Sequence, residues 1–234
     1  MTIKGVLFDF SGTLFRAEST DSWLRAALGA SGTAVGEAEF TRLSAELEAV
    51  GALPGGATPA RVPEELTQVW DDRDIGSEQH RAAYTGIARQ VRLPGAGLHD
   101  ALYERHMAPA AWHPYPDAAE VLKGLHARGV AVAVVSNIGW DLRPVFLEHG
   151  VDAYVGAYAL SFEHGIQKPD PRLFGAACDA LDVDARNVLM VGDNRHADGG
   201  ATALGCAVHF VDHLPARDRP DGLRPVLDLV DRAS

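Results

Sequence analysis

The 234-residue chain is long enough to bury a full core, and its 47% hydrophobic and 23% charged residues exclude a disordered, collagen-like or coiled-coil protein. With 21 Lys and Arg against 32 Asp and Glu, the net charge is −11, so we expect neither nucleic acid nor membrane as a partner. No apolar run approaches a membrane span of roughly 20 residues, no secretory signal is evident, and two cysteines make no disulfide framework, so we expect a soluble cytoplasmic protein.

The chain begins with a predicted buried strand and continues into a long helical segment. Residues 3–8 are a short β-rich run that ends at Asp9 and the turn-forming Gly12. Residues 16–112 contain no convincing strand, and loops rich in proline and glycine separate helix-like stretches at 22–28, 36–50, 63–71 and 78–91. We therefore predict a helical insert, residues 16–112, within a core formed by residues 1–15 and 113–234.

Strands and helices alternate through the rest of the chain. The apolar runs are near-continuous rather than alternating, which is typical of parallel strands buried on both faces. In chain order, we predict a helix at 120–128, a strand at 130–135, a helix at 141–148, a strand at 158–160, a helix at 171–181 with Asp170 as its N-cap, a strand at 187–191, a helix at 197–204 and a strand at 207–211. This order predicts an α/β fold with an open, mostly parallel, Rossmann-like sheet and helices on both faces.

Polar side chains gather where these strands end. In open α/β sheets, ligands bind outside the carboxyl ends of the strands. The polar groups delivered there are Asp9, Ser11 and Thr13 after the first strand, Ser136 and Asn137 after the second, Lys168 in a loop, and Asp193 with Asp198 one turn on. Mg²⁺ prefers oxygen ligands and commonly shares carboxylates with substrate phosphates, so the set suits Mg²⁺ and a phosphate.

Four short motifs carry a resemblance to a known family. They are Asp-x-x-Gly-Thr at 9–13, Val-Ser-Asn at 135–137, Gln-Lys-Pro-Asp at 167–170 and Val-Gly-Asp-Asn-x-x-x-Asp at 191–198. In this order they resemble the motifs of the haloacid dehalogenase-like hydrolase superfamily, a large group of aspartate-nucleophile phosphatases. The resemblance runs from residue 3 to about 211, and the insert stands where that family places a helical cap.

The resemblance implies a role for each residue of the phosphoryl site. Asp9 would be the nucleophile that forms an aspartyl-phosphate, which splits one hard step into two easier ones. Ser136 and the backbone of Asn137 would hydrogen-bond the phosphoryl oxygens, and Lys168 would neutralise charge on the nucleophile and the transferring group. Ser11, Gly12 and Thr13 would bind the substrate from the nucleophile loop, with Thr13 bonding the phosphoryl group or bracing the loop.

The resemblance also implies the metal ligands. Asp193 would bind Mg²⁺ together with Asp9 and the backbone carbonyl of Ser11. Asp198 would support either the metal site or Lys168 by contacting the residues around it. Ordinary structural roles are the alternative at each of these positions, such as a capping carboxylate or a surface lysine. The histidines, His213 among them, show no metal-ligand spacing and suggest surface or packing roles.

Position 11 departs from the pattern of the family's phosphatases, which have a second aspartate there as general acid and base. Ser11 can still offer its backbone carbonyl to Mg²⁺, but its hydroxyl cannot exchange protons at neutral pH. General acid–base catalysis contributes roughly 10² to 10⁴ in rate. We therefore expect slow hydrolysis of alkyl phosphates, or a substrate whose leaving group needs no proton.

Other chemistries and roles of the family remain open. A haloacid dehalogenase, or another enzyme that hydrolyses a carbon–halogen bond, would use Asp9 without metal, but it has an aromatic residue at position 11 and no need of Asp193. A phosphonoacetaldehyde hydrolase needs a cap lysine, and the insert has none. Cation-transport ATPases have threonine at position 11, but this chain lacks membrane segments. A binding or regulatory module that kept the fold and lost turnover is the alternative outside enzymes.

The expected partner is a small phosphorylated molecule, bound by a monomer or a homodimer with Mg²⁺ as cofactor. In the related enzymes the cap closes over the core, excludes water and selects the substrate. Hinges are predicted near residues 15–17 and 112–116. The insert is rich in arginine, and one or two of these side chains could meet an anionic substrate: Arg25, Arg42, Arg61, Arg73, Arg81, Arg89 and Arg92.

Overall fold

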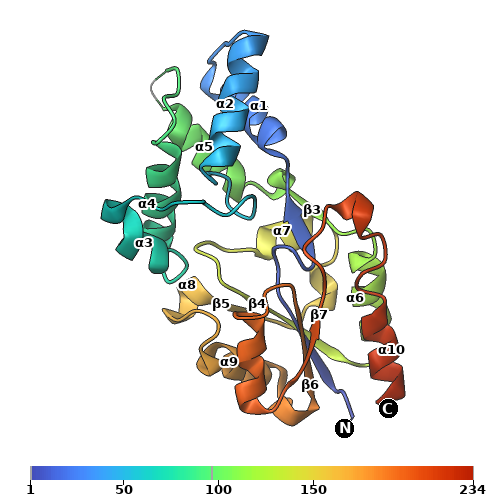
Figure 1. Ribbon diagram of the computed structural model, residues 1–234. Coiled ribbons are helices and arrows are strands. Elements are labelled where there is room, and N and C mark those ends of the chain that lie inside the picture. The colour runs from blue at the N-terminus through green and yellow to red at the C-terminus, as the bar shows by residue number, and fades with distance from the viewer. Residues whose placement is uncertain (1, 96, 234) are drawn as a thin grey trace.

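Five parallel strands form the central sheet of the computed structural model, which describes residues 2–95 and 97–233 (Figure 1). They are β1 (Gly5–Phe8), β4 (Ala131–Ser136), β5 (Ala157–Leu160), β6 (Val188–Gly192) and β7 (Ala207–Phe210). Their order is β5-β4-β1-β6-β7, so β1 lies at the centre, with Phe8 opposite Val134 on one side and Val191 on the other. The prediction of an open parallel α/β sheet is confirmed.

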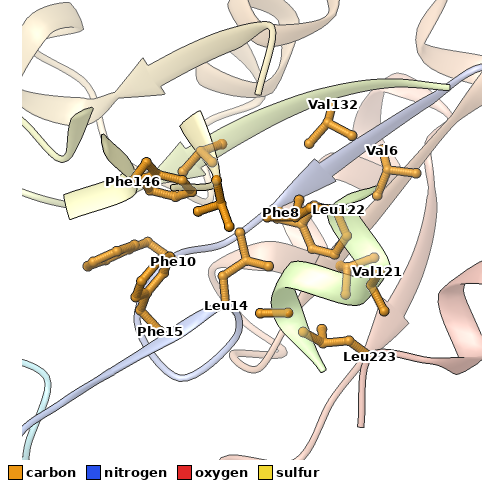
Figure 2. Packing of buried hydrophobic residues seen from close by; sticks show 14 of the residues in the cluster. Val6, Phe8, Phe10, Leu14, Phe15, Val121, Leu122, Val132, Phe146 and Leu223 are labelled. Carbon is orange, nitrogen blue, oxygen red and sulfur yellow. The ribbon is translucent and has the colours of Figure 1, made fainter. Parts of the chain in front are cut away.

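Helices cover both faces of the sheet because successive strand residues point to opposite sides. One face packs against α6 (Ala118–Ala127), α7 (Arg143–Glu148) and α10 (Pro225–Arg232), and the other against α9 (Pro171–Leu181) and the 3₁₀ helix η5 (Asp198–Leu204). Figure 2 shows Val6 and Phe8 of β1 beside Val121 and Leu122 of α6. The remaining short elements here are η3 (Asp152–Tyr154), α8 (Ser161–His164), η4 (Ala185–Asn187) and η6 (Ala216–Asp218).

The insert, residues 16–112, is helical and has a hydrophobic cluster of its own. Its elements are α1 (Thr20–Ser31), α2 (Glu37–Ala49), η1 (Glu64–Leu66), α3 (Thr67–Asp71), α4 (Ser77–Ala88), α5 (Leu98–Met107) and η2 (Pro109–Ala111). Trp23 and Leu43 are fully buried in this cluster. In Figure 1 the blue and green helices of the insert lie beyond the end of the sheet opposite the N-terminus.

Two strands at the ends of the insert differ from the strand-free segment that the sequence predicts. β2 (Phe15–Ala17) and β3 (Trp112–Pro114) pair as an antiparallel ribbon, with Arg16 opposite His113. The ribbon forms at the two segments predicted as hinges. Each strand has only three residues, too few for a hydrophobic pattern, and pairing is possible only because folding brings together residues about 100 positions apart.

Several helices also differ from their predictions, and the C-terminal helix α10 is not predicted at all. α5 is not predicted, because its polar face and the loop before it mask the apolar spacing. The helix predicted at 63–71 is divided into η1 and α3, and the one predicted at 197–204 is the 3₁₀ helix η5. The N-cap is as predicted, since the Asp170 carboxylate accepts a hydrogen bond from the amide of Arg172 at the start of α9. Among the described residues, no helix is long and apolar enough to cross a membrane.

Candidate active site

Most of the predicted site residues line one cavity of about 310 Å³ at the carboxyl ends of the strands, whereas Gly12 and Thr13 do not line it. Asp9 follows β1, Ser136 ends β4, and Asp193 follows β6, so the parallel arrangement brings the three side chains to the same edge of the sheet. The remaining predicted residues that line the cavity are Ser11, Asn137, Lys168 and Asp198. A wider groove of about 910 Å³ adjoins the cavity and shares Asp193 and Asn194 with it.

A buried lysine joins two aspartates at the floor of the cavity. The Lys168 ammonium lies 2.7 Å from Oδ1 of Asp9 and 2.6 Å from Oδ1 of Asp198, and all three side chains are at most 9% exposed. Burial lowers the pKa of Lys168, but the carboxylates of Asp198 and Asp9 outweigh it and hold the pKa above its ordinary value. The lysine is therefore a fixed positive charge next to Asp9.

The second oxygen of Asp9 is also oriented. Thr13 donates its hydroxyl to Oδ2 of Asp9 over 3.1 Å. Burial raises the pKa of Asp9 to about 7, against the effect of the Lys168 ammonium, and the charges of Asp198 and Asp193 add to the rise. A further cation at this point would favour the ionised carboxylate.

Asn137 fixes the loop that carries the lysine. Its side-chain amide donates to the carbonyl of Lys168 over 3.0 Å, and its Oδ1 accepts from the Lys168 amide over 2.6 Å. This two-point contact holds the backbone of Lys168 against the end of β4. The side chain of Asn137 thus positions Lys168, a contact that the sequence does not reveal.

Three carboxylates form a cluster that could hold a metal ion. One oxygen each from Asp9, Asp193 and Asp198 lies within 4.8 Å of the other two. Asp198 has both oxygens engaged, one by Lys168 and the other by the amide of Asn194 at 2.9 Å. Asp9 is engaged in the same way, by Lys168 and Thr13, so Asp193, whose Oδ2 contacts His213, is the carboxylate of the three with the fewest contacts among the described residues.

The loop after β1 leaves no room for a larger residue at Gly12. This glycine has φ +85°, and an added Cβ would lie 2.2 Å from an Asp193 oxygen. Beneath the loop, the Arg219 guanidinium donates to the carbonyls of Gly12 (2.6 Å) and Thr13 (2.5 Å) and packs over the ring of Tyr115. Arg219 is a supporting residue that no motif reveals, because it lies in the C-terminal segment outside the strand ends.

His213 contacts the site through one ring nitrogen, and the rest of its side chain is partly exposed to solvent. The sequence suggests a surface or packing role, and the side chain is indeed 42% exposed, but its Nδ1 lies 2.5 Å from Oδ2 of Asp193. The residue comes from the segment after β7, which folds back over the strand ends. Sequence spacing gives no sign of this contact.

The insert supplies the roof of the cavity. Its lining side chains include Arg73, Asp74, His80, Tyr84 and His106. Arg73 is thus the arginine of the insert that reaches the cavity, and its guanidinium packs over the Trp70 ring. None of these residues except Arg73 is singled out by the sequence for a site near an anionic group.

The two histidines of the roof are held neutral by burial. Burial lowers the pKa of His80 to about 3, and it also lowers the pKa of His106 well below its ordinary value. His80 Nδ1 lies 2.8 Å from the hydroxyl of Tyr103, whereas both ring nitrogens of His106 lack a hydrogen-bond partner among the described residues. The two histidines of the roof therefore contribute neutral imidazoles, and Arg73 contributes a cation.

Comparisons with known proteins agree with this geometry. Residues 3–203 match the family model of the haloacid dehalogenase-like hydrolases. The (S)-2-haloacid dehalogenase 4A of Burkholderia cepacia is 34% identical over 110 residues, which cover 47% of this chain and 46% of the relative. The phosphoserine phosphatase of Thermus thermophilus is 37% identical over 113 residues, covering 47% and 42%.

The aligned region thus spans less than half of the length of either relative. The crystal structure of a magnesium-bound hydrolase of this class from Bacillus subtilis covers 99% of this chain and 100% of its own, with a TM-score of 0.66 and 14% identity, a likeness of fold alone. Because the family match extends over four of the five sheet strands, the insert and every residue of the carboxylate cluster, the chain belongs to the haloacid dehalogenase-like hydrolases.

Proposed function

We propose that the chain is a Mg²⁺-dependent phosphatase of a small phosphorylated metabolite, with Asp9 as the nucleophile. The observation that carries the proposal is the state of this one carboxylate, buried at the end of the central strand with Lys168 on one oxygen and Thr13 on the other. A carboxylate held in a fixed direction can attack phosphorus in line without losing orientational entropy at that moment.

Lys168 and Ser136 would serve the transferring group. The ammonium of Lys168 neutralises charge on Asp9 and stays close to the phosphoryl oxygens as the aspartyl-phosphate forms. Ser136, at the end of β4, lines the same cavity and would hydrogen-bond a phosphoryl oxygen together with the amide of Asn137. The loop of Ser11, Gly12 and Thr13 would surround the remaining oxygens.

The residues present fit Mg²⁺. The donors are carboxylate oxygens, which suit this ion, and Asp9 with Asp193 and the Ser11 carbonyl would hold it. The cavity is lined by four carboxylates and two basic side chains, so a phosphate dianion would meet a surplus of negative charge without a cation. When bound, Mg²⁺ would neutralise that surplus and draw charge from the phosphoryl oxygens.

The insert would act as a cap over a core of residues 1–15 and 113–234. Its side chains line the roof of a cavity of about 310 Å³, which has room for a small metabolite and not for a macromolecule. The adjoining groove of about 910 Å³ would be the route by which substrate reaches Asp193.

A hydrolytic dehalogenase is the second candidate, since one relative is named for that activity. Asp9 would then attack the carbon that bears the halogen and release halide. Displacement of halide and hydrolysis of the resulting ester need no cation, whereas the surplus of carboxylates in the cavity fits a cation with a phosphate. The charge of the site therefore favours the phosphatase.

Two parallel assays test the proposal. Phosphate release from p-nitrophenyl phosphate should require Mg²⁺, stop with EDTA and vanish in Asp9→Asn, while chloride release from 2-chloropropionate should stay at background. Asp71→Asn, which removes an exposed carboxylate of the insert, is the matched control and should behave as wild type. Chloride release without metal would replace the phosphatase by the dehalogenase, and no Mg²⁺-dependent labelling of Asp9 by beryllofluoride would favour a binding module.

A further inference from the structure

Ser11 leaves the proposed phosphatase without a proton donor next to the nucleophile, and few groups in the cavity can replace it. Asp198 has both oxygens occupied, and Asp193 belongs to the carboxylate cluster and contacts His213. Lys168 is held as an ammonium by two carboxylates. These groups are committed to other contacts, and His213, which also lines the cavity, has its Nδ1 on Asp193.

The roof offers four further titratable side chains besides Arg73. His80 and His106 are neutral because burial lowers the pKa of each, and burial raises the pKa of Tyr84 to about 12. None of the three readily gives up a proton at neutral pH. Asp74 is the remaining group, a carboxyl that lines the same cavity as Asp9 with a side chain 9% exposed.

Asp74 is fastened directly to the part of the sheet that binds phosphate. Its backbone carbonyl accepts a hydrogen bond from the hydroxyl of Ser161. The same hydroxyl accepts a hydrogen bond from the backbone amide of Ile138 over 2.8 Å. Ile138 lies two residues after Ser136. Nearby, Gln167 donates to the carbonyl of Asp71 over 3.0 Å, which ties the same segment to the residue before Lys168. The roof carboxyl is thus held over the two loops that would grip the phosphoryl group.

The surroundings of Asp74 suit a group that holds and releases a proton. Burial raises the pKa of its carboxyl, while Arg73 and Lys168 act in the opposite direction. The Arg73 Nε lies 3.5 Å from Oδ2, and Tyr84, which faces the same carboxyl, stays a neutral phenol. A carboxyl with a raised pKa can be protonated before the reaction and ionised after it.

We propose that Asp74 of the insert is the general acid and base of this enzyme, replacing the carboxylate that position 11 lacks. The step rests on the proposed phosphatase. As Asp9 attacks phosphorus, the bond from phosphorus to the leaving oxygen breaks, and that oxygen takes the proton of the Asp74 carboxyl to leave as an alcohol. Water then attacks the phosphorus of the aspartyl-phosphate and gives one proton to the Asp74 carboxylate. The bond from Asp9 to phosphorus breaks, inorganic phosphate leaves, and the Asp9 carboxylate and the Asp74 carboxyl are restored.

This assignment predicts a dependence on the leaving group. Glycerol 3-phosphate releases a poor leaving group that needs a proton, whereas p-nitrophenyl phosphate releases a stabilised anion. Asp74→Asn keeps the shape of the side chain and the backbone carbonyl that Ser161 contacts. It should lower kcat/KM for glycerol 3-phosphate by about 10² to 10⁴, the usual contribution of general acid catalysis, and lower that for p-nitrophenyl phosphate by less than about fivefold.

Rescue separates proton transfer from a structural role. Asp74→Glu should retain more glycerol 3-phosphate activity than Asp74→Asn, and adding Ser11→Asp to Asp74→Asn should restore part of what was lost. The pH profile for glycerol 3-phosphate should lose one limb in Asp74→Asn. Asp71→Asn is again the control, an exposed carboxylate three residues away.

Three results would overturn the assignment. Equal losses on the two esters in a folded Asp74→Asn protein would make Asp74 a positioning residue, and wild-type activity on both would remove it from the reaction. Wild type that hydrolyses neither ester would defeat the phosphatase and this step with it. Wild-type activity on p-nitrophenyl phosphate distinguishes failure of the Asp74 assignment from failure of the proposed function.

Discussion

Methionine at position 168 would fill the space of the lysine stem and remove the ammonium group that Asp9 and Asp198 share. The ammonium lies 2.7 and 2.6 Å from the two carboxylates, and the three side chains are 3%, 9% and 0% exposed. Breaking a buried ion pair by removing one partner costs about 3–5 kcal/mol, because the remaining charge stays buried without compensation. For a chain of this size, each kcal/mol lowers Tm by roughly 2–4 °C, so we expect a loss of about 6–20 °C.

Urea unfolding at pH 7 in EDTA measures this cost without metal. A double-mutant cycle with Asp198→Asn supplies the control, since the ammonium then has one carboxylate fewer to neutralise and the cost of Lys168→Met should fall by at least about 1 kcal/mol. Added Mg²⁺ should stabilise both proteins as a ligand of the folded state. A cost below about 1 kcal/mol, or an equal cost in the two backgrounds, would refute the charge arrangement described here.

Three further predictions concern residues around the site. Arg219→Lys loses the two-pronged contact with the Gly12 and Thr13 carbonyls and should cost about 1.5–3 kcal/mol in urea unfolding, with lower kcat; unchanged values would contradict a supporting role. Gly12→Ala places a Cβ against Asp193 at a residue with φ +85°, so it should lower the free energy of unfolding by about 1–2 kcal/mol. It should also weaken Mg²⁺ binding measured by calorimetry, and full Mg²⁺ affinity would argue against Asp193 as a ligand. The folded-state pKa of His80 lies at about 3, below its unfolded value. Neutral His80 therefore stabilises the fold above about pH 6.5, and about 2 kcal/mol of the free energy of unfolding is lost when the pH falls to about 5. His80→Gln should flatten the curve of stability against pH by that amount.

The floor of the site could be predicted because sequence and topology coincide there. Asp9, Ser136 and Asp193 each follow a buried apolar strand, and parallel strands bring their carboxyl ends to one edge. The near-continuous apolar runs identify those strands without any knowledge of the partners. Three residues distant in sequence can therefore be assigned to one site from local patterns alone.

The supporting contacts of the floor could not be predicted, because they depend on irregular segments. Arg219 and His213 lie after the last strand, where the chain has no periodic pattern, and their partners are a backbone carbonyl and a carboxylate more than 19 residues away. The sequence predicts no contact for the side chain of Asn137, yet this side chain forms two hydrogen bonds with the backbone of Lys168. Hydrogen bonds of this kind have no sequence period that an observer could count.

The burial of Asp74 in the roof of the cavity also could not be predicted from the sequence. Residues 71–74 read Asp-Asp-Arg-Asp, a charged run that sequence reasoning would assign to a solvated surface. Docking of the insert buries only the last of these carboxyls, because Ser161 takes its carbonyl and Gly139 allows His80 to pack at a distance where a Cβ would clash. A carboxyl group buried at the cost of desolvation, in a chain with serine at position 11, fits the proton-transfer role proposed for Asp74.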